Sequence, residues 1–330
     1  MKISVLGAGT WGMALARLLC LNQHEVTVYS AIPSEIDELA STRLHKNLPG
    51  MIIPDEIIFT KDLKEACIDK EIVVFAVPSI FVRSTANKAK EFLNNKQVIV
   101  DVAKGIEADT LLTMSEVIKS ELGEDFNVVA FSGPTHAEEV AKDLPTTIVS
   151  ACKNEEAAKL VQDAFMNSNM RVYTNDDVLG VELCGALKNI IALASGVSTG
   201  LGFGDNSKAA IITRGIAEMK RLGLLMGAKN ETFSGLAGIG DLIVTCTSIH
   251  SRNNRCGMLL GQGVSAEEAK KQVGMVVEGI NALPAAMKLK EKYDVDMPII
   301  ETVNKIVFEG ADPKTEVIKL MNRDKKNEID

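Results

Sequence analysis

The chain has 330 residues, which is enough for about two domains. Hydrophobic residues make up 46% and charged residues 24%, a balance that excludes disorder over the whole chain. There are 44 acidic and 36 basic residues, giving a net charge of −8, which argues against nucleic-acid binding by counterion release.

The N-terminal part alternates short apolar segments with helical patterns. Strands are expected at 3–6, 25–29, 71–77, 97–102 and 128–131, and a helix at 10–21. Segments such as 72–77 are apolar at every position, which is typical of parallel strands covered on both faces. The pattern predicts an α/β fold with an N-terminal Rossmann-type, doubly wound, mostly parallel sheet.

Helical patterns take over from about residue 176. Asp176 or Asp177 can cap a helix through 181–194, and Asp205-Asn206-Ser207 can cap another that ends near Gly227. Further helices are expected at 254–260, 265–272, 279–292 and 299–308. We therefore expect a dinucleotide-binding domain, 1–176, followed by an all-helical substrate-binding and catalytic domain, 177–330. The charged and polar residues 323–330 are expected to fray.

The six cysteines and four histidines form no cluster with metal-ligand spacing. The cysteines are interpreted as small apolar residues of a reducing, cytoplasmic compartment, without a metal site or disulfides. No charge-free apolar window reaches the length of a membrane span, and no signal peptide is visible. The expectation is a cytoplasmic protein with no membrane span.

A glycine motif marks the start of the chain. Gly7-Ala8-Gly9-Thr10-Trp11-Gly12 follows a predicted strand and opens a predicted helix, the context of a dinucleotide-binding loop. Gly7 permits the tight turn, Gly9 lets a pyrophosphate approach the backbone, and Gly12 lets helix and strand pack closely. The helix N-terminus then presents free N–H groups to the phosphates.

The end of the second predicted strand normally selects between the two nicotinamide dinucleotides. An acidic residue there binds the ribose 2′-hydroxyl of NAD, whereas a nearby arginine accepts the 2′-phosphate of NADP. The chain has Ser30 and Ala31 at this point, and neither is of these types. The choice between NADH and NADPH therefore stays open.

Lys188 stands in the middle of the apolar helical segment 181–193. The helix positions three and four residues from it carry no carboxylate. Burying an ammonium is costly, and burial favours the neutral amine, which suits a general acid or base. Lys188 is therefore a candidate catalytic residue, and the alternative is a structural ion pair.

Three further residues are candidates for binding or orienting a substrate. Asp241 ends the mobile-looking loop 238–240 and could orient Lys188 or a substrate hydroxyl, or cap a helix. Arg252, within the basic and amide-rich segment 251–255, offers a planar donor fork for a phosphate, or begins a solvated helix. Lys104 follows a predicted parallel strand at the ligand-binding edge of the sheet, or is an ordinary loop lysine.

Taken together, these motifs resemble the bacterial NAD(P)-dependent glycerol-3-phosphate dehydrogenase family over essentially the whole chain. The resemblance is carried by segments 7–12, 102–105, 132–139, 187–189, 235–242, 251–255 and 276–279. It implies reversible reduction of dihydroxyacetone phosphate to sn-glycerol 3-phosphate with NADPH or NADH, supplying glycerophospholipid synthesis. The family often has a basic residue where this chain has Ala31, a departure that bears on the usual NADP preference.

The resemblance also implies roles for individual residues. It makes Lys188 the catalytic lysine, with a role in substrate binding as well. Beside the three glycines of the loop, it assigns to the cofactor site Thr10, Trp11, Lys104, Ala137, Arg252, Val276 and Glu278. It assigns to the substrate site Lys104, Gly133, Thr135, Asp241, Ser251, Arg252 and Asn253.

Two other functions are compatible with the sequence. One is a related Rossmann-plus-helical dehydrogenase of the 3-hydroxyacid or 6-phosphogluconate type, and the other is a non-catalytic dinucleotide sensor. The phosphate-sized anion implied by Arg252 favours the triose phosphate over the first, and the central Lys188 favours an enzyme over the second. A homodimer is compatible with the sequence, which does not give the oligomeric state.

Overall fold

The computed structural model describes residues 1–325 and 327–328. Within it the chain forms two compact units, each assembled from two segments: Met1–Gly185 with Ala228–Asp241, and Ala186–Gly227 with Leu242–Asp330. A single domain boundary at residue 176 stays a prediction. Residues 326 and 329–330, part of the segment expected to fray, lie outside the described residues.

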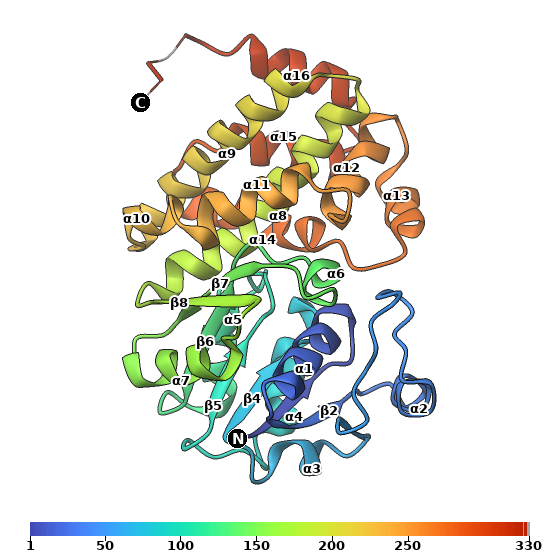
Figure 1. Ribbon diagram of the computed structural model, residues 1–330. Coiled ribbons are helices and arrows are strands. Elements are labelled where there is room, and N and C mark those ends of the chain that lie inside the picture. The colour runs from blue at the N-terminus through green and yellow to red at the C-terminus, as the bar shows by residue number, and fades with distance from the viewer. Residues whose placement is uncertain (326, 329–330) are drawn as a thin grey trace. The chain divides into compact units, whose positions relative to one another are not determined.

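The first unit is built on one eight-stranded sheet with the order β3-β2-β1-β4-β5-β6-β7-β8 (Figure 1). All neighbouring strands are parallel except β6 and β7, which are antiparallel. This is the doubly wound, mostly parallel sheet that the sequence predicts. The strands are β1 (Lys2–Leu6), β2 (Glu25–Tyr29), β3 (Ile58–Thr60), β4 (Ile72–Phe75), β5 (Val98–Asp101), β6 (Asn127–Ser132), β7 (Thr146–Ala151) and β8 (Met170–Asn175).

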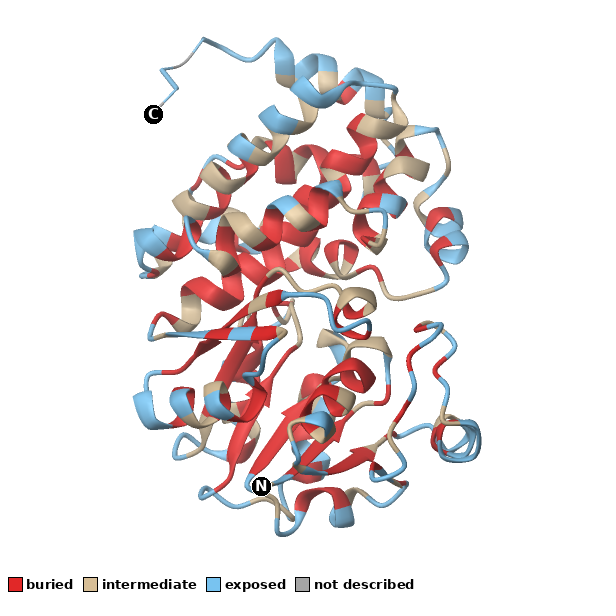
Figure 2. Cartoon of the chain, in the orientation of Figure 1, coloured by how far each residue is buried: buried red, intermediate tan, exposed pale blue. Residues whose placement is uncertain are grey.

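Hydrophobic side chains cover both faces of this sheet. On β4, Val74 belongs to one core cluster, whereas Val73 and Phe75 belong to the other, and all three are fully buried. Figure 2 shows the central strands as buried along their length. The uninterrupted apolar segments therefore predict doubly covered strands correctly.

Helices on both faces supply these cores. The first cluster includes residues of α1 (Thr10–Leu21), α2 (Pro33–Thr42), α6 (Ala137–Val140) and α7 (Glu155–Phe165), and the second includes α3 (Leu63–Cys67), α4 (Val82–Ala89) and α5 (Met114–Leu122). Three short elements complete the unit: η1 (Ser79–Phe81), α10 (Asn230–Phe233) and η2 (Leu236–Gly240).

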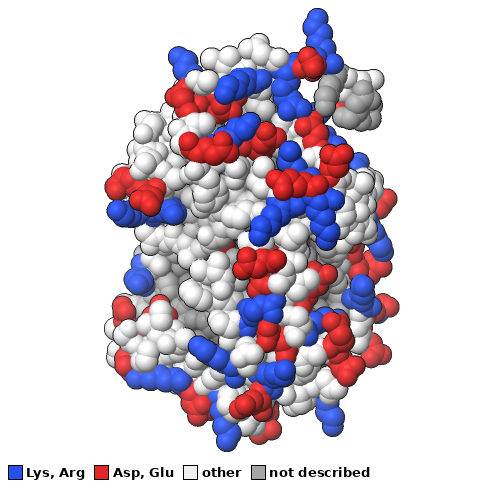
Figure 3. Space-filling view, turned by 180° about the vertical axis from the view of Figure 1, so that it is seen from behind, with Lys and Arg blue, Asp and Glu red and all other residues white. Residues whose placement is uncertain are grey.

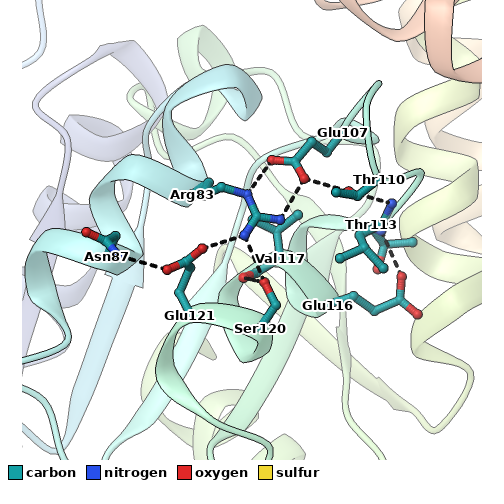
Figure 4. A network of polar contacts seen from close by, with 10 residues as sticks. Arg83, Asn87, Glu107, Thr110, Thr113, Glu116, Val117, Ser120 and Glu121 are labelled. Atoms are coloured by element: carbon teal, nitrogen blue, oxygen red, sulfur yellow. Dashed lines mark hydrogen bonds and ion pairs between the residues drawn. The ribbon is translucent and has the colours of Figure 1, made fainter.

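A polar network fixes the loop that precedes α5 (Figure 4). The Arg83 guanidinium on α4 donates to both carboxylate oxygens of Glu107, at 2.7 and 2.6 Å, and pairs with Glu121 on α5. These hydrogen bonds from Arg83 hold the pKa of Glu107 below its usual range. The network ties α4, the 102–113 loop and α5 together, and this loop carries Lys104.

The second unit is helical over its described residues. It contains the later part of α8 (Val178–Gly200), all but the first residue of α11 (Asp241–Thr247), and α9 (Asp205–Met226), α12 (Arg252–Gly261), α13 (Ala266–Val273), α14 (Glu278–Lys292), α15 (Pro298–Phe308) and α16 (Pro313–Met321). Every helix predicted in this part is confirmed. Most agree within a few residues at each end, whereas α8 continues six residues beyond the predicted end at 194.

The expected helix caps are partly wrong. Asp177 behaves as predicted, because its Oδ1 accepts a hydrogen bond from the Gly180 N–H at 3.0 Å at the start of α8. Asp205 does not cap α9: the N-cap residue is Gly204, without a side-chain cap bond, and Asp205 is the first helical residue. A carboxylate there still faces the positive end of the helix dipole.

By length and composition α8 could cross a membrane: its most apolar 18-residue window has a mean hydropathy of 1.6. That window is 83% buried inside the protein, which is usual for the core helix of a soluble protein. On the face shown in Figure 3, acidic and basic side chains are interspersed rather than gathered by sign.

Candidate functional site

The loop between β1 and α1 has the geometry that its glycines predict. Gly7 has a φ of +124°, and a Cβ at this position would lie 2.5 Å from the Ala76 carbonyl oxygen after β4. A Cβ on Gly12 would lie 2.1 Å from the Gly7 carbonyl oxygen. A Cβ on Gly9 would meet nothing within 4 Å, so open space adjoins the backbone there. Two glycines thus close the turn, and the third leaves room for a ligand.

The residues of this loop fit a dinucleotide pyrophosphate. Gly9 caps α1 without a side-chain hydrogen bond, which leaves the N–H groups of the first turn for a ligand. The Thr10 hydroxyl oxygen is buried and has no hydrogen-bond partner among the described residues. The loop also lies where the strand order reverses between β1 and β4, the usual place for a dinucleotide in such sheets.

Two residues that sequence reasoning missed lie against the glycine loop and the end of β2. His45 is buried, and burial lowers the pKa of its imidazole despite a hydrogen bond to the backbone of Ala8 within the glycine loop. Glu35, in the first turn of α2, accepts a hydrogen bond from the Ser30 hydroxyl at 2.7 Å. Position in the first turn of the next helix is the signal that could have found Glu35.

Four predicted substrate-site residues of the first unit come together after β5 and β6. Lys104 Nζ donates to Asp241 Oδ2 at 2.8 Å and to the Gly133 carbonyl at 3.1 Å. The Thr135 hydroxyl donates to the same carbonyl at 3.1 Å. The Asp241 side chain is 2% exposed and that of Lys104 18%, so the ammonium is positioned while still reaching solvent.

Asp241 corrects one expectation about its loop. Residues 236–240 form a single wide helical turn, η2, rather than a mobile loop, and Asp241 is the first residue of α11. A Cβ on Gly238 would lie 2.3 Å from the Phe233 carbonyl oxygen, so this turn is tightly packed. The carboxylate orients Lys104, which identifies Lys104 as more than an ordinary loop lysine.

Lys188 lies in the second unit and is only 5% exposed, as the apolar pattern predicts. Its Nζ donates a hydrogen bond to the Thr245 hydroxyl of α11 at 2.7 Å. Thr245 was missed by sequence reasoning, although it stands four residues after Asp241 on the same helix. Asp241 and Thr245 therefore share one face of α11, just as Gly185 and Lys188 share one face of α8. The amine is thus held by a neutral hydroxyl in a dry environment.

A chain of amides stands beside Lys188. Asn253 Nδ2 donates to Asn189 Oδ1 at 2.9 Å, and Asn253 Oδ1 accepts from the Gly279 N–H at 2.8 Å. Both side chains are buried. The side chain of Asn253 is therefore held on both sides of its amide group, and Asn189, absent from the predicted site list, belongs to the same network.

The 251–255 segment begins α12. Ser251 is the N-cap residue, and its hydroxyl accepts from the Asn254 N–H at 3.2 Å. Arg252 is the first helical residue and is half-buried. Among the residues that the structure describes, no carboxylate forms an ion pair with its guanidinium. A helix N-terminus and an uncommitted guanidinium together suit a phosphate.

The remaining predicted cofactor residues lie at the starts of helices. Ala137 is the first residue of α6, which packs on α1, and Glu278 is the first residue of α14, two residues after Val276. Glu278 Oε2 accepts from Asn281 Nδ2 at 3.3 Å. Over the described residues, no group of His, Cys, Asp and Glu could hold a metal ion.

Comparison with known proteins covers both units. Residues 2–158 match the family model described as "NAD-dependent glycerol-3-phosphate dehydrogenase N-terminus", and residues 177–318 match that of the C-terminus. A glycerol-3-phosphate dehydrogenase (NAD(P)+) 2 from Lactobacillus delbrueckii subsp. bulgaricus is 66% identical, covering 99% of each chain. One from Agathobacter rectalis is 53% identical over 99% of this chain and 97% of its own. A crystal structure of glycerol-3-phosphate dehydrogenase from Coxiella burnetii superposes with a TM-score of 0.94 at 37% identity, covering 98% and 99% of the two chains.

Proposed function

The chain belongs to the NAD-dependent glycerol-3-phosphate dehydrogenase family, and from this premise we propose that it reduces dihydroxyacetone phosphate reversibly to sn-glycerol 3-phosphate. It is an oxidoreductase that uses NADH or NADPH. The product supplies glycerophospholipid synthesis. The observation that carries the chemistry is Lys188, an amine in a buried helix whose orientation is fixed by a hydroxyl at 2.7 Å.

In this proposal the first unit binds the pyrophosphate of the cofactor. Gly7, Gly9 and Gly12 shape the loop, and Thr10 and Trp11 open α1 against the pyrophosphate. The resemblance to the family adds further cofactor residues from each unit: Lys104 and Ala137 from the first, and Arg252, Val276 and Glu278 from the second. When bound, the reduced nicotinamide supplies the hydride that converts the C2 ketone to an alcohol.

Lys188 acts as the general acid. Its Nζ donates a hydrogen bond to the C2 carbonyl oxygen, polarises the carbonyl, and transfers a proton as negative charge develops on that oxygen. In the reverse direction the neutral amine accepts the proton of the C2 hydroxyl. Thr245 holds the amine in place through both steps, because a hydroxyl can accept from an ammonium and donate to an amine.

The phosphate of the substrate is bound by Arg252 at the N-terminus of α12, with Ser251 and Asn253 beside it. In the first unit, the proposed substrate-binding residues are Lys104, which Asp241 orients, Gly133 and Thr135. Anchoring the phosphate fixes the ketone for transfer, which removes much of the entropic cost of the reaction. A ketone without the phosphate loses this anchor.

The proposal is tested by following the absorbance of NADH and NADPH in parallel assays with dihydroxyacetone phosphate. We expect substrate-dependent oxidation of the reduced cofactor, and its reversal with glycerol 3-phosphate. Cofactor binding without turnover on this ketone would favour a dinucleotide sensor instead. Turnover on 3-hydroxyacids but not on the triose phosphate would favour the other dehydrogenase type. We further propose a cytoplasmic enzyme that assembles as a homodimer, which sedimentation of the purified protein tests.

A further inference from the structure

We propose that the dinucleotide site selects NADH over NADPH, because Glu35, held by Ser30, places a carboxylate at the ribose end of the site and repels a 2′-phosphate. The inference rests on the proposed function and specifies the cofactor of that same site. It concerns residues of the first unit only.

The geometry joins Glu35 to the end of β2. That strand ends at Tyr29, and the next residue, Ser30, is 6% exposed. Its hydroxyl donates to Glu35 Oε2 at 2.7 Å and accepts from the Ile32 N–H at 3.1 Å. A buried serine therefore locks both the turn after β2 and the carboxylate that follows it.

Glu35 occupies the position of the acid that binds a ribose in NAD sites. That acid follows the glycine loop by about 20 residues in the general pattern, at the end of the second strand. Glu35 is not at the strand end in sequence, but its hydrogen bond to Ser30 returns its carboxylate there. A carboxylate oxygen can accept a hydrogen bond from the 2′-hydroxyl of NADH. Against a 2′-phosphate it offers only like charge.

Among the residues that the structure describes, no lysine or arginine forms an ion pair with Glu35. Residues 30–42 contain no lysine, arginine or histidine. Arg43 is committed elsewhere, since its guanidinium donates to the carbonyls of Pro54 and Ile57 and lies over the Phe59 ring. Lys61 pairs with Asp37 at 2.5 Å.

His45 is the third basic side chain near Glu35, and it does not add a positive charge there at neutral pH. Burial lowers the pKa of its imidazole, and the Lys46 charge acts in the same direction. The carboxylates of Glu35 and Glu38 both act on this ring, raising its pKa, so they face the same region. A neutral imidazole with two carboxylates is a poor site for a phosphate dianion.

The test measures cofactor binding rather than turnover. Trp11 is the only tryptophan of the chain and stands in the glycine loop, so energy transfer from it to the reduced nicotinamide reports binding of either cofactor equally. Dissociation constants for NADH and NADPH are measured for the wild type, for Glu35→Gln, and for the matched control Glu38→Gln, which removes one charge from the same helix without touching Ser30. Ser30→Ala frees the carboxylate without removing it.

We expect the wild type to bind NADH at least about tenfold more tightly than NADPH, a ratio that one like-charge contact can produce. Glu35→Gln should bring the two constants together, mainly through tighter NADPH binding. Glu38→Gln, which removes a carboxylate that Ser30 does not hold, should lower the ratio much less. Ser30→Ala should lower the ratio in part. Equal or tighter NADPH binding by the wild type, or an unchanged ratio in both Glu35→Gln and Ser30→Ala, would overturn the proposal. Failure of triose phosphate reduction with both cofactors would instead refute the proposed function and leave this binding preference standing.

Discussion

The candidate functional residues of the two units differ in kind. In the first unit the dinucleotide end is mostly backbone: three glycines, a helix N-terminus and the open space beside Gly9. In the second unit the groups are side chains, with Lys188 held by Thr245 and Asn189 held by Asn253. A backbone site fails when a Cβ is added, whereas a side-chain site fails when a functional group is removed.

The largest effect is expected from the side-chain part. Lys188→Ala should lower kcat by about 10²–10⁴-fold, because general acid catalysis contributes that much, while the Kd for NADH stays near the wild-type value. Steady-state kinetics with Trp11 fluorescence titration measures both. The exposed Lys271 of α13 provides the control, and Lys271→Ala should behave as wild type. Near-normal turnover of Lys188→Ala would show that Lys188 is not the general acid. The second unit would then not depend on this side chain for catalysis.

The second-largest effect tests whether the positive charge of Arg252 in the second unit binds the substrate phosphate. Arg252→Ala should raise the KM for dihydroxyacetone phosphate by about 10–100-fold at saturating cofactor, the worth of a charge-assisted bidentate contact. The KM for unphosphorylated dihydroxyacetone should hardly change. Arg255, exposed on the same helix, supplies the matched variant Arg255→Ala, for which no change is expected. Equal losses on both ketones would show that Arg252 does not bind the phosphate.

The difference between backbone sites and side-chain sites also explains which parts of the structure the sequence predicts. Backbone sites leave a spacing pattern, so the Gly7–Gly12 loop and its helix at 10–21 are predicted to the residue. Fully buried strands are predicted because their apolar segments are continuous. β3, β7 and β8 were missed: β3 has three residues, β7 includes three hydroxyl residues, and β8 alternates buried and exposed positions at the sheet edge.

Side-chain partners leave weaker traces in a sequence. The burial of Lys188 is predictable from its apolar helix, but its partner Thr245 is 57 residues away in the chain. The pairing of Asp241 with Lys104 spans 137 residues. Glu35 was not predicted as a cofactor residue because the general pattern places the acid at the end of the second strand. In the structure Glu35 lies on the following helix, and its carboxylate returns to that strand end through the hydrogen bond from Ser30. Tertiary contacts, which no local pattern encodes, decide these assignments.

A pair of glycine variants tests whether the first unit is a backbone site. Gly9→Ala fills only the open space, so thermal stability should be unchanged while the Kd for NADH rises about tenfold, a cost of about 1.4 kcal/mol. Gly12→Ala puts a Cβ against the Gly7 carbonyl and should destabilise the fold by about 1–3 kcal/mol. Thermal unfolding and fluorescence titration of both variants separate the effects. Wild-type NADH affinity in Gly9→Ala would mean that the pyrophosphate does not approach there.

The smallest effect concerns a feature that the units share. In each, a buried glutamate accepts hydrogen bonds from the first turn of another helix: Glu182 from Ser115 of α5, and Glu218 from Ile299 and Ile300 of α15. Burial raises the pKa of each to about 7. Around Glu218, the Arg221 charge lowers the pKa and the Asp296 charge raises it, both less than burial does.

The sign of the resulting pH dependence follows from proton binding. An unfolded glutamate has a pKa of about 4.3, so between that pH and about 7 the folded chain keeps a proton that the unfolded chain releases. The free energy of unfolding therefore falls as pH rises through this window. Glu218→Gln cannot ionise and should show a smaller drop in thermal midpoint from pH 5 to pH 8, whereas the exposed Glu267→Gln should keep the wild-type drop. If Glu218→Gln and wild type lose stability in parallel, Glu218 carries its charge in the folded protein throughout, and the N-terminus of α15 stabilises a carboxylate more strongly than burial opposes it.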